Sequence, residues 1–186
     1  MRTFIAIDIE TPELVSKLVN IQDYIKKTGA AMKMVEPENF HITLKFLGEI
    51  SPSDVTVITD ALKKALADAK IFEISLEGIG AFPTIAKPRV IWVGISTGKD
   101  FLKILVKKIS HELLSIGIRG DNKEFHPHVT LARVKRFNRD LVRALEELGN
   151  IKIGSMIVKH VRLKKSVLTP QGPIYSTLVE IPLKDT

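Results

Sequence analysis

Two tetrapeptides of the same kind, one in each half of the chain, carry the residues best suited to chemistry. They are His41-Ile42-Thr43-Leu44 and His128-Val129-Thr130-Leu131, whose histidines lie 87 positions apart. In an extended strand alternate side chains share a face, so each histidine and its threonine point one way while the apolar residues pack behind them. If the two strands lie side by side, a small anion between them meets two titratable bases and two hydroxyl donors. These groups suit acid-base chemistry on a phosphate.

The segments that must position these motifs follow a repeated order of strands and helices. Alternating or continuous apolar residues predict strands at 2–9, 40–47, 71–79, 89–95 and 128–134, and more strands from residue 151 around a turn at 169–173. A short apolar run at 31–35 leads to a turn at 36–39. Helical spacing predicts helices at 12–25, 51–70, 100–116 and 139–148, and loops are expected at 78–88 and 119–127. The order strand, helix, motif strand, helix, strand thus occurs in both halves.

This order predicts an α+β fold. We expect residues 1–186 to form a single bilobal domain of two interleaved, pseudo-twofold-related lobes, with one motif in each. Each lobe would be an antiparallel sheet with helices on its outer side, and the lobes would face each other across a central cleft. No Ser/Gly-rich linker separates the halves.

Composition narrows the classes of function. The 186 residues are 45% hydrophobic, enough for one substantial core, and the net charge of +7 favours a polyanionic partner. The chain has no cysteine, which excludes disulfides, thiol nucleophiles and cysteine-ligated metals. No signal peptide and no apolar run of membrane-spanning length can be placed, so we expect a cytoplasmic protein.

The motifs and their flanks resemble a known family. Two His-x-Thr-x motifs with apolar x mark the two-histidine (2H) phosphoesterase superfamily. The flanks are similar to its RNA 2′,3′-cyclic phosphodiesterase branch, also called 2′-5′ RNA ligase, in segments 2–6, 37–49, 80–83, 88–94, 125–133 and 172–175. The resemblance implies a bilobal fold, no metal or other cofactor, and hydrolysis of an RNA 2′,3′-cyclic phosphate to a 2′-phosphate.

The reaction assigns separate tasks to the motif residues. Water must attack phosphorus opposite the leaving oxygen, so the base and the acid stand on opposite sides of the phosphate, as twofold-related histidines can. By likeness to the family, His128 would be the proton acceptor and His41 the proton donor, with the reverse assignment left open. Thr43 and Thr130 would donate hydrogen bonds to the non-bridging oxygens.

Three further residues are candidates for substrate binding. The family suggests a phosphate contact for Arg133, but this residue lies five positions after His128, on the opposite face of a regular strand unless the strand bulges. Phe46 and Tyr175 resemble positions that shape the nucleotide site, where they could stack on a base.

The remaining polar and aromatic residues have more ordinary interpretations. His126 is expected to have a structural role in its loop, and His111 and His160 to be solvated or packing residues. The basic stretch 159–165 alternates as a strand would, and is either a solvated face or a groove for an RNA backbone. Phe82 and Trp92 are expected to be core and loop anchors.

Two rival functions stay open at this stage. One is a non-catalytic module that binds the cyclic phosphate end of an RNA. The other is 2′-5′ ligation by the reverse reaction, without ATP, since no P-loop is present. In each case the partner would be RNA with 2′,3′-cyclic phosphate ends, tRNA fragments being one source, and the protein is expected to be a monomer that binds no membrane.

Overall fold

Strands and helices alternate along the chain and confirm the expected α+β class. The computed structural model describes residues 1–185. In chain order the elements are β1 (Arg2–Asp8), α1 (Pro12–Lys26), β2 (Ala31–Met34), the short 3-10 helix η1 (Pro37–Asn39), β3 (His41–Glu49), α2 (Asp54–Ala65), β4 (Phe72–Thr84), β5 (Lys87–Ile95), α3 (Lys99–Ser115), β6 (His128–Arg136), α4 (Arg139–Glu147), β7 (Lys152–Val158), β8 (His160–Thr169) and β9 (Gly172–Pro182).

The strands form one antiparallel sheet in the order β7-β4-β5-β6-β3-β1-β8-β9, with β2 paired to β6. Its two halves meet where the motif strands β3 and β6 join, and the register there consists of a single pair, Ile42 opposite Val129. Beyond that pair, the same edge of β6 pairs with β2 instead of β3. The sheet therefore divides into a half of four strands (β3, β1, β8 and β9) and a half of five (β7, β4, β5, β6 and β2), which are joined at the motifs.

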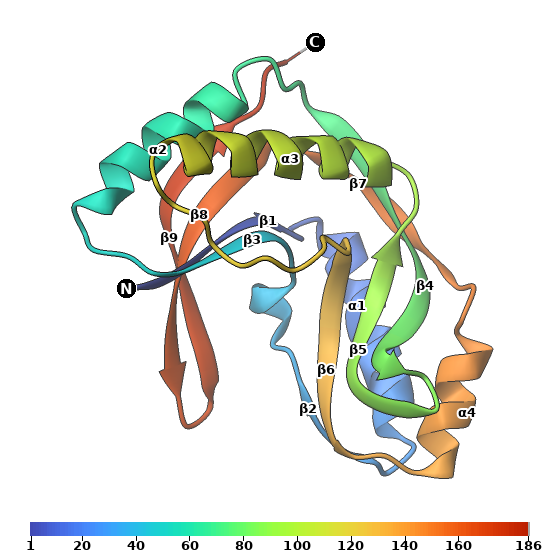
Figure 1. Ribbon diagram of the computed structural model, residues 1–186. Helices are drawn as coiled ribbons and strands as arrows, with labels where there is room; N and C mark the ends of the chain where they lie inside the picture. Colours follow the sequence, from blue (N-terminus) through green and yellow to red (C-terminus); the bar gives the residue numbers. More distant parts are fainter. Residues whose placement is uncertain (186) are drawn as a thin grey trace.

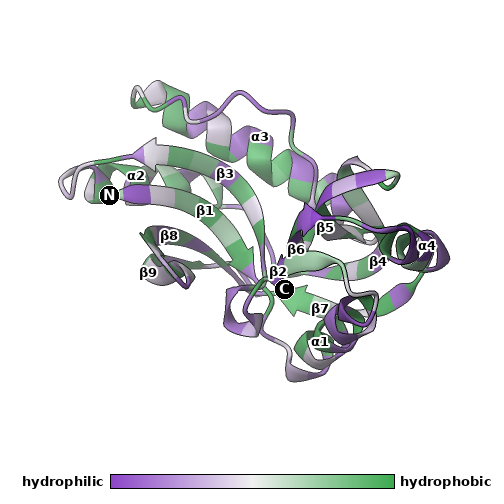
Figure 2. Cartoon of the chain, turned by 90° about the horizontal axis from the view of Figure 1, so that it is seen from below, coloured by the Kyte–Doolittle hydropathy of each residue, from purple (hydrophilic) through white to green (hydrophobic). Residues whose placement is uncertain are grey.

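Helices cover each half of the sheet. Helices α2 and α3 pack together over the half that contains β3 and β9, while α1 and α4 lie against the half that contains β6 and β7 (Figure 1). Since α1 follows β1 in the chain but packs on the other half, the two lobes exchange elements along the sequence. In Figure 2 β1 and β3 are coloured mainly as hydrophobic, whereas α4 is mainly hydrophilic.

The helical stripes predicted from the sequence pack into the core. The apolar residues of α1 that recur at helical spacing are all buried: Leu14, Leu18, Ile21 and Ile25. Helix α3 buries Leu102, Leu105, Ile109 and Leu113. Each such side chain contributes about 1.5–3 kcal/mol through the removal of apolar surface from water. In residues 1–185 no helix is long and apolar enough to cross a membrane.

The prediction of a loop at 78–88 was wrong, because most of this segment belongs to a β-hairpin. Strand β4 continues to Thr84, β5 begins at Lys87, and Pro83 lies opposite Pro88 next to a register shift. Prolines are tolerated at such an irregular end of a ladder, where a missing N–H breaks no hydrogen bond. The glycine within the segment serves packing: a Cβ at Gly80 would lie 2.3 Å from the Trp92 ring.

Two predicted boundaries also moved. Helix α2 ends at Ala65 rather than near Lys70, because the following residues pair with the C-terminal segment: the amide of Ile71 donates to the carbonyl of Lys184. Strand β3 was predicted to end at residue 47. It continues through Gly48, which has φ +75°, and ends at Glu49.

Candidate active site

The two motifs lie beside each other on neighbouring antiparallel strands. Ile42 and Val129 are register partners and both are fully buried. His41 and Thr43 stand on either side of Ile42, and His128 and Thr130 on either side of Val129, so these four side chains lie on the other face of the sheet. The two imidazoles are near enough for the charge of His128 to lower the pKa of His41.

The two imidazoles are held in the same way. The Nδ1 of His41 lies 2.7 Å from the carbonyl oxygen of Asn39, and the Nδ1 of His128 bonds to the carbonyl of His126, again two residues upstream. A carbonyl only accepts, so Nδ1 carries the hydrogen in both rings. The Nε2 atoms are therefore the ones that can gain or lose a proton, and that of His41 lies 2.9 Å from the Thr43 hydroxyl.

Burial lowers the pKa of both histidines below the ordinary 6.5. The backbone carbonyl that each Nδ1 contacts acts in the opposite direction, since it stabilises the protonated ring. The two sites differ in their charged neighbours. Asp8 raises the pKa of His41, Lys164 and His128 lower it, and His126 lowers the pKa of His128.

The asymmetry has a structural origin in the strands that flank the motifs. On β1, Asp8 is the register partner of His41, whereas on β5 the partner of His128 is Gly94. Only His41 thus has a carboxylate directly across the ladder. Sequence analysis missed Asp8, although an acidic residue in the otherwise apolar run 4–9 was an available signal.

Asp8 belongs to an ionic network on the same face. Lys164, only 6% exposed, places Nζ 2.9 Å from both carboxylate oxygens of Asp8, and Arg162 donates to Asp8 at 3.0 Å. Arg162 also donates to Glu10 at 2.7 Å and to Glu180 at 2.6 Å. Of the basic stretch 159–165, these two cations are therefore neutralised by nearby carboxylates and do not present a free groove.

Around His128 the surroundings are aromatic instead. The Phe82 ring meets that of His128 edge-on at 5.2 Å, and Trp92 lies 4.7 Å from His126 and 6.1 Å from His128. Trp92 Nε1 is buried without a hydrogen-bond partner among the described residues. Phe82 and Trp92 thus line the motif face, where sequence analysis expected only core and loop anchors.

A β-bulge decides the position of Arg133. Leu131 is an extra residue of β6, because the consecutive β5 residues Ile91 and Trp92 pair with Ala132 and Thr130 and leave Leu131 without a partner on β5. Leu131 and Ala132 are consequently both buried, and exposed Arg133 returns to the face that carries His128 and Thr130. The proximity of Arg133 to the site is also evident from its charge, which lowers the pKa of Tyr175.

The first motif strand contains the same irregularity. Leu44 of β3 is an extra residue against β1, and Phe46, five residues after His41, returns to the motif face. Phe46 pairs with Phe4, and their rings are 6.1 Å apart. The Tyr175 ring completes this aromatic group, 5.0 Å from Phe4 and 5.4 Å from His41. All seven site residues suggested by the sequence therefore lie on one face of the sheet, or against it.

The other histidines lie apart from this arrangement. His111 is exposed on α3, and His160 at the start of β8 lies 3.8 Å from Glu180. Within residues 1–185 no group of three or more His, Asp and Glu side chains is placed to hold a metal ion.

Two His-x-Thr strands joined at the centre of one antiparallel sheet define a two-histidine phosphoesterase. The comparisons with known proteins agree. The family model described as LigT-like phosphoesterase matches residues 7–92 and again 93–175, so each half of the chain contains one copy. The chain belongs to this family.

Its relatives extend over nearly the whole chain. An Aeropyrum pernix protein named RNA 2′,3′-cyclic phosphodiesterase is 45% identical over 90% of this chain and 96% of its own length. A Methanothermobacter thermautotrophicus protein of the same name is 38% identical over 96% of each. Among solved structures, TT0787 of Thermus thermophilus matches with a TM-score of 0.82 at 26% identity over 98% of both chains.

Proposed function

We propose that this chain hydrolyses RNA 2′,3′-cyclic phosphate ends to 2′-phosphates by two-histidine acid-base catalysis, with residues 1–186 acting as one bilobal domain. The observation that carries the proposal is the Ile42–Val129 pairing, which sets one His-x-Thr pair against the other. Relatives named RNA 2′,3′-cyclic phosphodiesterase support the choice of substrate.

In the proposed reaction, a water oxygen forms a bond to phosphorus while the bond from phosphorus to the ribose 3′-oxygen breaks. His128 Nε2 accepts the water proton, and protonated His41 Nε2 gives its proton to the leaving 3′-oxygen. The 2′-phosphate product follows from this choice of leaving oxygen. The two proton transfers use the two Nε2 atoms, and we propose that no metal or other cofactor takes part.

The flanking strands support His41 as the donor. A donor must be protonated before reaction, and Asp8 across the ladder favours the charged imidazolium of His41, while Lys164 and His128 act in the opposite direction. His128 has Gly94 at the corresponding position, with no carboxylate to stabilise its charged form, and His126 lowers the pKa of His128, which favours the neutral form.

The other site residues would bind the substrate. We assign Thr43 and Thr130 to the non-bridging oxygens, whose negative charge grows in the transition state. Arg133 would contact the phosphate from the same face. Phe46 and Tyr175, beside Phe4, would stack on or enclose the terminal nucleoside.

The product of one reaction tests the proposal. A short RNA ending in a 2′,3′-cyclic phosphate, incubated with the protein in EDTA, should be converted to the 2′-phosphate, identified by ³¹P NMR. A 3′-phosphate product would contradict the choice of leaving oxygen. Tight binding without turnover would favour the alternative function, a non-catalytic RNA-end binding module.

The pH dependence should reflect the two buried imidazoles. We expect kcat/KM to be bell-shaped with its maximum below pH 6.5, because burial lowers the pKa of His41 and His128. The protonated donor is lost as pH rises through these lowered values, and the neutral acceptor is lost as pH falls. The kcat profile should lie at higher pH, since a bound anionic phosphate raises both pKa values. A maximum of kcat/KM above about pH 7.5 would contradict this expectation.

The same site would also permit the reverse reaction. A 5′-hydroxyl in place of water would give a 2′-5′ linkage without ATP, and we propose ligation as a secondary activity. We further propose that the protein is a monomer that acts in the cytoplasm on cleaved RNAs such as tRNA fragments, binding no membrane. The positive net charge of +7 supports an RNA partner.

A further inference from the structure

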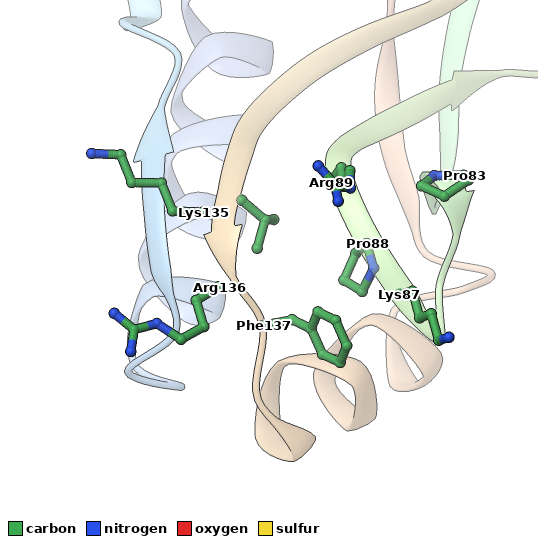
Figure 3. Close-up of a pocket in the computed structure, with 8 residues that line it drawn as sticks. Pro83, Lys87, Pro88, Arg89, Lys135, Arg136 and Phe137 are labelled. Carbon is green, nitrogen blue, oxygen red and sulfur yellow. The ribbon is translucent and has the colours of Figure 1, made fainter.

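A basic groove lies beyond the catalytic face, at the end of the second motif strand. It has a volume of about 630 Å³ and runs between the β4–β5 hairpin and the end of β6 (Figure 3). Figure 3 shows Phe137 in the middle, with Lys87 and Arg89 on the hairpin side and Lys135 and Arg136 extending to the β2 side. Basic side chains therefore flank an aromatic ring on both sides.

The groove begins where the proposed active site ends. Strands β5 and β6 pair only as far as Val90 and Arg133. The groove is lined by the residues that follow Arg133 on β6 and by those that precede Val90 on β5. Arg133 thus stands at the boundary, with Lys33 of β2 as its other register partner. From His128, Lys135 is seven residues along the strand, roughly 23 Å, a distance that a few linked nucleotides span.

The charges of this groove are available for a ligand. In the described part of the chain, the basic residues Lys87, Arg89, Lys135 and Arg136 are exposed and form no salt bridge. Arg162 and Lys164 differ, since Asp8, Glu10 and Glu180 neutralise them. The four cations of the groove are therefore free to meet a polyanion, whereas Arg162 and Lys164 are already neutralised.

Phe137 supplies a second kind of contact. Its side chain is 44% exposed, although it stands at the end of a strand among charged residues. Exposed aromatic rings between cations are a common means of holding single-stranded nucleic acid, because each base has a face on which to stack while the cations follow the phosphates.

We infer that this groove binds the RNA strand that leads to the cyclic phosphate, with the backbone held by Lys87, Arg89, Lys135 and Arg136 and a base stacked on Phe137. The inference rests on the proposed function for the position of the RNA end. It adds a site for the body of the substrate, several nucleotides from the reacting phosphate, and predicts a preference for oligonucleotides over cyclic mononucleotides.

The test compares two substrates, an octanucleotide with a 2′,3′-cyclic phosphate end and a 2′,3′-cyclic mononucleotide. K135A/R136A should lower kcat/KM for the octanucleotide by about tenfold at about 0.1 M salt and change that for the mononucleotide less than about twofold. The slope of log(kcat/KM) against log salt should become shallower by about 0.7 for each phosphate that the variant no longer neutralises. Phe137→Ala should weaken octanucleotide binding at least about fivefold.

A matched control removes the same charge elsewhere. Lys107 and Lys108 are exposed on α3, over the other half of the sheet. K107A/K108A should leave kcat/KM unchanged for both the octanucleotide and the mononucleotide. Equal loss of octanucleotide activity in the two double variants, or none in either, would overturn the inference. If the wild type hydrolyses neither substrate, the proposed function fails; fluorescence anisotropy with a 5′-labelled octanucleotide then still decides whether K135A/R136A weakens binding.

Discussion

Replacing either motif histidine by alanine should lower kcat for opening the cyclic phosphate by about 10²–10⁴-fold, with a smaller change in KM. Each imidazole is fixed through Nδ1 by a backbone carbonyl, which leaves Nε2 for the proton transfer that alanine would remove. H41A/H128A should be scarcely slower than the worse single variant, because the two act in one step. Steady-state kinetics with a cyclic mononucleotide measure kcat and KM for the two single variants and the double variant.

His111→Ala is the matched control, since this histidine is exposed on α3 and should leave kcat unchanged. Thermal unfolding of each variant distinguishes loss of chemistry from loss of fold, because His41 also packs against Phe4 at 5.2 Å. If either motif variant retained a kcat within about threefold of the wild type, the two-histidine mechanism would be excluded for this chain.

The face of each motif could be predicted from sequence because it depends on one local rule. Alternation in a strand places His41 with Thr43 and His128 with Thr130, and the apolar residues between them are buried in the structure. The pairing of β3 with β6 could be anticipated only from the repeated pattern, since the two strands are far apart in the chain and share a single register pair.

Arg133 and Phe46 show where the local rule ends. By alternation, each belongs to the face opposite its histidine, and the bulges at Leu131 and Leu44 reverse this. A bulge arises from a mismatch between two paired strands, so no property of either strand alone reveals it. The same bulge in both motif strands gives the two halves equivalent positions, one filled by a cation and the other by an aromatic ring.

The residues that sequence analysis missed depend on long-range contacts. Asp8 is 156 positions from Lys164, the cation to which it is bound, and no spacing rule connects them. Trp92 was expected in the core, but it reaches the motif face because Gly80 on the neighbouring strand leaves space for its ring. Glycine in a strand interior was the available signal, and it was interpreted as part of a loop.

Thr43→Val and Thr130→Val should each lower kcat by about 10²–10³-fold, as expected for loss of a donor to a charge that develops in the transition state. Valine keeps the branched shape that a strand favours and removes only the hydroxyl, so the fold should persist. Serine keeps the donor, and Thr43→Ser and Thr130→Ser should retain kcat within about tenfold. For Thr43 the hydroxyl is 2.9 Å from His41 Nε2, which places it beside the group that transfers the proton.

The serine variants separate the proposed role from a purely structural one. If the threonines only filled space, valine would be the better substitute and serine the worse, since serine loses a methyl group. The proposed role predicts the reverse order in kcat. Thr59→Val on α2 serves as the control, because that hydroxyl bonds to the carbonyl of Val55 within its own helix, far from the motifs in the sheet. Valine variants of Thr43 and Thr130 that were as active as their serine counterparts would remove both hydroxyls from the mechanism.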